Sequence, residues 1–298
     1  MAAPLAGGRA YLAVVTSIVI PAHNEAGVIG RLLRQMTSDA NPGEFDVIVV
    51  ANGCTDETAE VAAKFGPAVR VLSIPVPSKH AALTAGDQVA SDFPRIYLDA
   101  DVELHSSDLR ALGEALQRPG VLAVAPRREL ALTGRPWLVR WYYDVWTQLP
   151  EVREGLFGRG VIGVSALGHA RMADLPPVLA DDLAASLAFT PEERYIVPNA
   201  RVLIHPPRTF GDLLRRRVRA VVSVAQIENN GAGKNGTEKN EAARTRPADL
   251  LAIARGGHGM APRVTAFVLI AVVARLRARR TLARRDYSTW LRDESSRQ

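Results

Sequence analysis

The chain has 298 residues, of which 47% are apolar, a content that suits a well-buried globular protein and excludes a disordered or fibrous chain. Its length allows one large domain, or one domain with an appended subdomain. Lys and Arg exceed Asp and Glu by 37 to 31, so the formal charge is +6 and we expect anionic partners. The single cysteine, Cys54, excludes an internal disulfide framework and suits a reducing compartment, so a cytoplasmic location is expected.

The first apolar run, Tyr11–Ile20, is predicted to form a strand and not a targeting segment. Only Arg9 precedes it as a positively charged side chain, and Pro-Ala-His-Asn-Glu follows it directly. Residues 1–13 are then an N-terminal tail. No apolar stretch reaches the about 18 residues needed to cross a bilayer, so no membrane-spanning helix is expected.

The first half alternates between short apolar runs rich in β-formers and segments with helical spacing. This alternation predicts an α/β fold with a mostly parallel sheet flanked by helices. Apolar residues recur with helical spacing over 28–36, and Thr55 or Asp56 can cap a helix that runs to Phe65. Strands are predicted at Val14–Ala22, Phe45–Ala51, Val69–Ile74, Arg95–Leu98 and Val121–Pro126, and further helices at Lys79–Ala90 and Ser107–Leu116.

The second half is less regular. An aromatic segment, Trp137–Trp146, either stacks on a ligand or packs in a core. A glycine-rich run over 158–165 follows, in which Gly160 and Gly163 can let the backbone approach a ligand. The polar stretch over about 229–246 is predicted to be a mobile loop. Helices are predicted at Thr209–Ile227, about Pro247–Arg255 and Pro262–Leu282.

Polar side chains follow three of the predicted strands at the point where each strand ends. His23-Asn24-Glu25 follow the first strand, Asn52 follows the second, and Asp99 and Asp101 follow the fourth. Because the carboxyl ends of parallel strands share one edge of a sheet, we expect these groups to meet there. Residues i and i+2 of an extended segment project to the same side, so two carboxylates can share one divalent cation and its phosphate ligands. The sequence therefore predicts a metal-diphosphate site, with a solvated turn as the alternative for an isolated Asp-x-Asp.

Five motifs follow one another along the chain: Ile20-Pro-Ala-His-Asn-Glu25, Asn52-Gly-Cys-Thr-Asp-Glu-Thr58, Ser78-Lys-His-Ala-Ala-Leu83, Asp99-Ala-Asp101 and Ala180-Asp-Asp-Leu183. In order and rough spacing they resemble a family-2 glycosyltransferase of the GT-A fold, over about residues 14–225. The resemblance implies transfer of a sugar from a nucleoside diphosphate donor to an acceptor hydroxyl, normally with inversion of the anomeric centre. It also implies a divalent metal, Mg²⁺ or Mn²⁺, on the diphosphate.

The resemblance also implies a catalytic domain over 14–210, followed by a helical region over 211–298. The nucleotide-binding half would span about 14–127 and the acceptor half about 128–210. Asn52 stands where the family often has an aspartate, so it offers a base one donor and one acceptor but no charge. In this resemblance Pro21, Ala22, Asn24 and Glu25 line the nucleoside pocket, and Asn52 and Lys79 contact the base or the ribose-phosphate region. Asp99 lies near the ribose and metal, Ala100 contacts the nucleotide sugar, and Asp101 is the direct metal ligand.

An acceptor hydroxyl needs a carboxylate within hydrogen-bond reach to take its proton. Asp182 matches the second residue of the family's acidic pair and is the predicted catalytic base, with Asp181 orienting the loop or the acceptor. Both precede an apolar helical segment, so simple helix capping is the alternative. His205 could either bind the metal or have a structural role. Further candidates for acceptor or phosphate contact are Gly163, Ser165, Arg216 and Arg217.

Two other functions stay open at this point, a sugar-phosphate nucleotidyltransferase and a non-catalytic membrane-binding or scaffold protein with this fold. The first strand leads into a segment without a glycine-rich triphosphate loop, which disfavours the nucleotidyltransferase. The acceptor is left open between a saccharide, a lipid-linked compound and a small molecule, and nucleic acid is not expected as a partner. An apolar run, Val264–Ala274, leads into a cluster of arginines, which suggests peripheral contact of the C-terminal helix with the inner face of a membrane.

Overall fold

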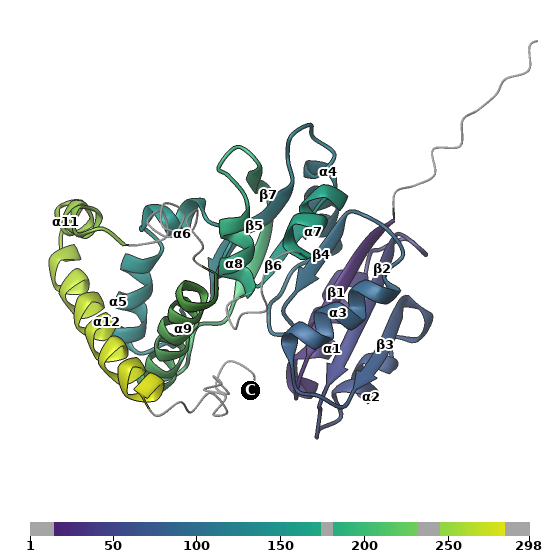
Figure 1. Ribbon diagram of the computed structural model, residues 1–298, viewed down its shortest axis with the longest axis horizontal. Coiled ribbons are helices and arrows are strands. Elements are labelled where there is room, and N and C mark those ends of the chain that lie inside the picture. Colours follow the sequence, from purple (N-terminus) through teal and green to yellow (C-terminus); the bar gives the residue numbers. More distant parts are fainter. Residues whose placement is uncertain (1–14, 174–180, 232–244, 284–298) are drawn as a thin grey trace, which may run out of the picture.

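The computed structural model describes residues 15–173, 181–231 and 245–283. A seven-stranded sheet in the order β3-β2-β1-β4-β6-β5-β7 runs through the molecule (Figure 1). All strands but β6 point the same way, because β6 pairs antiparallel with both β4 and β5. The strands are β1 (Thr16–Ala22), β2 (Phe45–Asn52), β3 (Val69–Ile74), β4 (Arg95–Leu98), β5 (Ala123–Leu130), β6 (Val161–Val164) and β7 (Arg194–Ile204).

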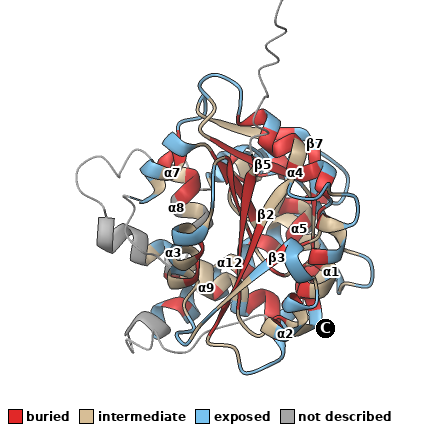
Figure 2. Ribbon diagram, turned by 90° about the vertical axis from the view of Figure 1, so that its right-hand side faces the viewer, coloured by how far each residue is buried: buried red, intermediate tan, exposed pale blue. Residues whose placement is uncertain are grey.

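Helices cover both faces of the sheet, so the strands are buried between two layers (Figure 2). Ile18 and Ile20 of β1 pack in one core with residues of α1 and α4, whereas Val19 packs with Ala82 of α3 on the opposite face. This division follows from the alternation of side chains along a strand. The helices of this part are α1 (Ala26–Thr37), α2 (Thr58–Ala63), α3 (Lys79–Val89), α4 (Ser106–Ala115), α7 (Ala166–Ala173) and α8 (Asp181–Ala188), with the 3₁₀ turn η1 (Gly66–Ala68).

The remaining helices gather at one end of the molecule, away from α1, α2 and α3 (Figure 1). They enclose a second apolar core, in which the ring of Tyr142 stacks on that of Phe267 with centroids 5.0 Å apart. Ala274 and Ala278 are fully buried against Leu214 and Val218, because small side chains let two helices approach closely. These helices are α5 (Trp137–Trp146), α6 (Pro150–Glu154), α9 (Phe210–Gly231), α11 (Pro247–Arg255) and α12 (Met260–Ala283).

None of the described helices combines the length and the apolar content that a transmembrane span requires. The boundaries predicted for the domains stay predictions. The N-terminal tail and most of the predicted mobile loop, 232–244, lie outside the described residues. α9 continues to Gly231, just past the start predicted for that loop.

The predicted α/β architecture is confirmed, and two strands that the sequence did not reveal complete it. β6 lies within the run that was interpreted only as glycine-rich. β7 is the longest strand, but Pro198 interrupts its apolar pattern. Its pairing with β5 shifts between Pro126 and Arg127, so the segment around Pro198 forms an irregularity in the ladder. Proline has no N–H to donate, and such irregularities are where a strand tolerates it.

Candidate active site

The side chains of Lys79 and Asp99 meet at the edge of the sheet where the parallel strands end. Lys79 is the first residue of α3, which begins there because the Ser78 hydroxyl accepts a hydrogen bond from the N–H of Ala81. Its Nζ lies 2.9 Å from Oδ1 of Asp99, the residue that follows β4. Each of the two side chains is 39% exposed, so this ion pair is open to solvent and to a ligand.

Gly160 brings a second backbone segment against Asp99. Its carbonyl accepts a hydrogen bond of 2.8 Å from the N–H of Asp99, and its φ of +65° is in the left-handed region that favours glycine. A Cβ on Gly160 would lie 2.7 Å from Cγ1 of Val102 and 3.1 Å from Oδ2 of Asp99. Only a glycine therefore fits at position 160, where the two backbone segments approach each other.

A small cavity of about 40 Å³ opens beside this ion pair. It brings three residues predicted from the sequence, Pro21, Lys79 and Asp99, together with Gly160. Ligand pockets usually measure about 300–1,000 Å³, so this cavity is smaller than a usual ligand pocket. Sequence reasoning did not find the other lining residues, because apolar side chains carry no chemical signal: Leu83, Tyr97, Leu98, Val161, Ile162, Met172 and Ala185.

The loop after β1 is held against the loop after β2. Asn24 has a φ of +51°, and its side-chain carbonyl accepts a hydrogen bond of 2.8 Å from the N–H of Thr55. Glu25 is buried, and its backbone N–H donates to the Thr58 hydroxyl at 2.8 Å. These contacts fix the path of the Pro-Ala-His-Asn-Glu motif.

Asn52 lies between the same two loops and is 2% exposed. Its side-chain Nδ2 donates to the backbone carbonyl of Ala22 at 2.9 Å. The backbone carbonyl of Asn52 accepts from Nδ1 of His23 at 2.6 Å. Among the described residues, no group donates to Asn52 Oδ1. The sequence suggested that the Asn52 side chain could offer a base both a donor and an acceptor. In the structure its NH₂ group already donates to backbone carbonyls, so only Oδ1 is left, as an acceptor.

Ala100 is buried and Asp101 is half-buried just beyond β4. Two residues further, Glu103 accepts a hydrogen bond of 2.8 Å from Gln35 and lies 3.2 Å from Nε of Arg31. Nε2 of His205, which follows β7, lies 2.5 Å from Oε1 of Glu103. Burial alone would raise the pKa of the Glu103 carboxyl, but its hydrogen bonds and the Arg31 charge outweigh burial and lower that pKa.

Within the described ranges, no cluster of three or more His, Cys, Asp or Glu side chains could hold a metal ion by itself. Asp99 and Asp101 both follow β4 and carry hard carboxylate oxygens, but residues 100–101 form a turn in place of the extended segment expected from the sequence. Magnesium is commonly bound by one or two carboxylates together with the phosphates of a substrate. The two aspartates therefore fit a metal that a diphosphate helps to bind. His205, the other candidate metal ligand, contacts the carboxylate of Glu103.

The structure places Gly163 and Ser165 away from the edge at Lys79 and Asp99, and their predicted roles stay predictions. β6 runs antiparallel to β4. Val161 therefore pairs with Leu98 at the edge that carries Lys79 and Asp99, and Val164 pairs with Arg95 at the opposite edge of the sheet. Ser165 therefore lies beyond the wrong end of the strand, where its hydroxyl accepts from the N–H of Gly168 in α7. A Cβ on Gly163 would meet the side chains of Val124 and Leu116, so this glycine faces the core.

Arg216 and Arg217 lie on α9 and do not line the cavity beside Asp99. The guanidinium carbon of Arg217 is 5.6 Å from the centre of the Tyr142 ring on α5. Asp181 and Asp182 form the first turn of α8, and their side chains lie outside the described part of the chain. Their predicted roles stay predictions.

Comparison with known proteins gives a consistent picture. The family model "Glycosyl transferase family 2" matches residues 17–172, more than half of the chain. Glycosyltransferase AglE of Haloferax volcanii is 27% identical over 226 residues, covering 71% of this chain and 73% of that protein. An uncharacterized glycosyltransferase of Mycobacterium tuberculosis is 32% identical over 124 residues, covering 42% of this chain and 54% of that protein.

Two solved structures share the fold. Mannosyltransferase PcManGT from Pyrobaculum calidifontis, in complex with GDP-Man and Mn²⁺, has a TM-score of 0.61 and 20% identity, covering 89% of this chain and 86% of that chain. Glucosyl-3-phosphoglycerate synthase from Mycobacterium tuberculosis, in complex with Mn²⁺, UDP-glucose and phosphoglyceric acid, has a TM-score of 0.54 and 21% identity, covering 72% and 79%. The GT-A fold expected from the sequence is thus confirmed. The match of the family model over residues 17–172 shows that this chain belongs to glycosyl transferase family 2.

Proposed function

We propose that this glycosyltransferase transfers a sugar from a nucleoside diphosphate donor to an acceptor hydroxyl in an inverting, metal-dependent reaction. The observation that carries the proposal is the Lys79–Asp99 pair beside a cavity that Pro21 and Gly160 also line. The pair combines a cation for phosphate oxygens with a carboxylate for a metal or a ribose hydroxyl. The nucleotide sugars and Mn²⁺ in the two similar structures support the same class of donor.

The residues fit a divalent metal, Mg²⁺ or Mn²⁺, held by Asp101 with Asp99 nearby. When bound, such a cation neutralises the charge that develops on the leaving diphosphate. The donor phosphates would complete the coordination, because the described residues do not supply three protein ligands.

The chain's own residues supply the remaining steps of the proposed reaction. Lys79 and the N-terminus of α3 present positive charge to the phosphates, and Oδ1 of Asn52 accepts a hydrogen bond from the nucleoside. Asp182 removes the proton of the acceptor hydroxyl as that oxygen attacks the anomeric carbon, and the bond to the diphosphate breaks in the same displacement. Attack opposite the leaving group inverts the anomeric centre.

Family membership favours this reaction over nucleotidyl transfer to a sugar phosphate and over a non-catalytic scaffold. Incubation with a nucleoside triphosphate and a sugar 1-phosphate checks the first alternative, since only a nucleotidyltransferase releases pyrophosphate.

Isothermal titration with UDP-, GDP- and dTDP-sugars, in Mn²⁺, in Mg²⁺ and in chelator, tests the proposal. We expect one donor class to bind in the presence of metal and Asp101→Asn to weaken that binding at least about tenfold. Glu114→Gln, an exposed carboxylate on α4, is the charge-matched control and should bind as the unchanged protein does. Absence of binding by every donor, or binding indifferent to both metal and Asp101→Asn, would refute it.

A further inference from the structure

α12 is apolar on two opposite sides, and only one of them is covered. Phe267, Ile270, Ala274 and Ala278 are at most 5% exposed, because they pack against α5 and α9. A second set, at positions i, i+1, i+4, i+5 and i+8, lies on the other side of a helix with 3.6 residues per turn. These residues are Val268, Leu269, Val272, Val273 and Leu276, and each is exposed.

Arginines continue this exposed side toward the end of the helix. Arg279 and Arg280 follow Leu276 by three and four residues, the spacing of neighbours on one helix face, and both are exposed. The helix contains five arginines and no Asp or Glu. We call the set of Val268, Leu269, Val272, Val273, Leu276, Arg279 and Arg280 the α12 surface.

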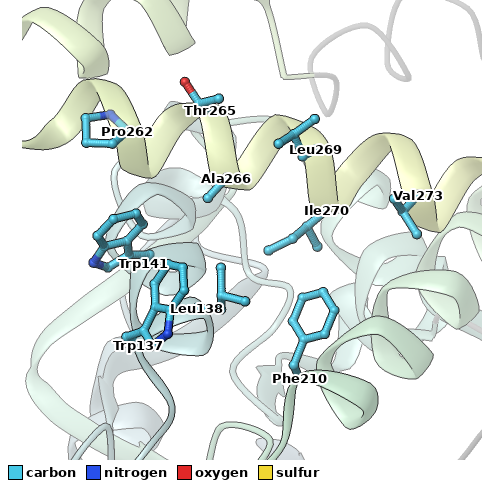
Figure 3. A pocket seen from close by; sticks show the side chains of 10 residues that line it. All are labelled: Trp137, Leu138, Trp141, Phe210, Pro262, Thr265, Ala266, Leu269, Ile270 and Val273. Carbon is cyan, nitrogen blue, oxygen red and sulfur yellow. The ribbon is translucent and has the colours of Figure 1, made fainter.

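An apolar groove of about 330 Å³ adjoins the α12 surface. Figure 3 shows the rings of Trp137, Trp141 and Phe210 beneath α12, with Leu269 and Val273 also lining the groove. Trp137 is 58% exposed, and its ring lies edge-on to that of Trp141 with centroids 4.8 Å apart. An exposed tryptophan beside aliphatic side chains is typical of a surface at the boundary between water and an apolar phase.

We propose that the α12 surface, with Trp137 at its edge, binds the surface of a bilayer that contains anionic phospholipid. The apolar side chains would enter the headgroup boundary, and Arg279 and Arg280 would reach lipid phosphates. The exposed apolar side from Val268 to Leu276 spans about 12 Å of helix, whereas a hydrocarbon core is about 30 Å thick, so α12 lies along the membrane.

Charge favours a bilayer over a second copy of this chain. Two copies of the α12 surface would bring arginines to an interface to which α12 contributes no carboxylate. Arginines buried without an opposite charge destabilise an interface, whereas anionic lipid supplies that charge. α12 also lies at the end of the molecule away from α1, α2 and α3 (Figure 1).

Co-sedimentation of the full chain with vesicles tests this inference. Vesicles of phosphatidylcholine alone are compared with vesicles that contain about 30% phosphatidylglycerol. We expect the protein to pellet with the anionic vesicles and not with the neutral ones. Leu269→Gln/Leu276→Gln should weaken binding at least about tenfold, and Arg279→Gln/Arg280→Gln about tenfold or more with a weaker dependence on salt.

Leu167→Gln and Arg34→Gln are the matched controls, because both side chains are exposed on helices far from α12 in the sequence. Both should bind as the unchanged protein does. Trp137 supplies a second measurement, since its transfer to the interface should shift the tryptophan emission to shorter wavelength, and Trp137→Phe should remove that change. Donor titration should give the same affinity for all these variants, so a failed membrane test is separate from a failed donor test.

Three outcomes overturn the inference. The first is equal recovery of the protein in the pellet with and without anionic vesicles. The second is loss of binding in the control variants as large as in the α12 variants. The third is a dimer in light scattering that Leu269→Gln/Leu276→Gln dissociates, because that result assigns the surface to a second copy of the chain.

Discussion

The ammonium group of Lys79 lies 2.9 Å from Oδ1 of Asp99, although the two residues are 20 positions apart and belong to different elements. The contact forms because α3 begins at Lys79 and β4 ends just before Asp99. A lysine at a helix N-terminus adds its charge to the positive end of the helix dipole, and the neighbouring carboxylate holds it there. This arrangement attracts phosphate while keeping a metal-binding oxygen beside it.

Removal of the Lys79 charge should weaken donor binding. A charge-assisted hydrogen bond contributes about 1.5–3 kcal/mol, so Lys79→Met should raise the donor dissociation constant about tenfold to a hundredfold. Isothermal titration measures this change. Lys64→Met, an exposed lysine after α2, is the control and should have no effect. An unchanged affinity in Lys79→Met would show that the Lys79 ammonium does not contact the donor.

Gly160→Ala should damage both stability and donor binding. The new Cβ would lie 2.7 Å from Cγ1 of Val102 and press on Asp99, so the loop must move. Overpacking of this kind costs about 1–3 kcal/mol, in addition to the cost of a positive φ in alanine. Urea unfolding and donor titration measure the two effects.

Gly134→Ala separates the two contributions in that experiment. Gly134 also has a positive φ, of +73°, but no atom lies within 4 Å of its Cβ position. We expect Gly134→Ala to lower the free energy of unfolding by only about 1 kcal/mol, the cost of a positive φ in alanine, and to leave the donor affinity unchanged. If both variants bind donor equally well, close packing at Gly160 does not shape the site.

Asp182→Asn should slow the reaction without weakening donor binding. A general base contributes about 10²–10⁴ in rate, so kcat should fall at least about a hundredfold. The donor dissociation constant should change less than about twofold, because the amide keeps the size of the side chain. Glu114→Gln, the exposed carboxylate on α4, is the control and should retain kcat. A normal kcat in Asp182→Asn would restrict Asp182 to its position in the first turn of α8.

Asp46 should make stability depend on pH in the acid range. Burial alone would raise the pKa of its carboxyl, but the N–H and hydroxyl of Ser91 and the guanidinium of Arg70 outweigh burial and lower that pKa. Because the folded pKa is below the unfolded value of about 3.9, the contribution is complete above that value and is lost as pH falls through the folded pKa.

Asp46→Asn should therefore lower the free energy of unfolding at pH 7, and the difference from the unchanged protein should shrink below about pH 4. We expect about 1–3 kcal/mol at pH 7, mostly from the Ser91 hydrogen bonds, because Arg70 is 46% exposed and an exposed ion pair contributes little. Urea unfolding at several pH values measures it, with Glu114→Gln as the control. A difference that is constant from pH 3 to pH 7 would contradict the assignment.

The sequence by itself determined the parallel half of the sheet and the residues at its edge. Buried parallel strands are continuous apolar runs, and the helices between them have a regular apolar spacing, so β1, β2, β3 and β4 were found with nearly their observed bounds. Since parallel strands end at one edge, the position of Asp99 at that edge followed from its place after Leu98, whereas Lys79 was expected near the donor only from the family resemblance.

Only the tertiary structure decided what the second half contributes. The direction of β6 is set by long-range pairing with β4 and β5, and no local pattern encodes that direction. This reversal brings Gly160 to Asp99 and sends Ser165 to the opposite edge. The two apolar sides of α12 are likewise indistinguishable in the sequence, because which side is buried depends on where α5 and α9 pack.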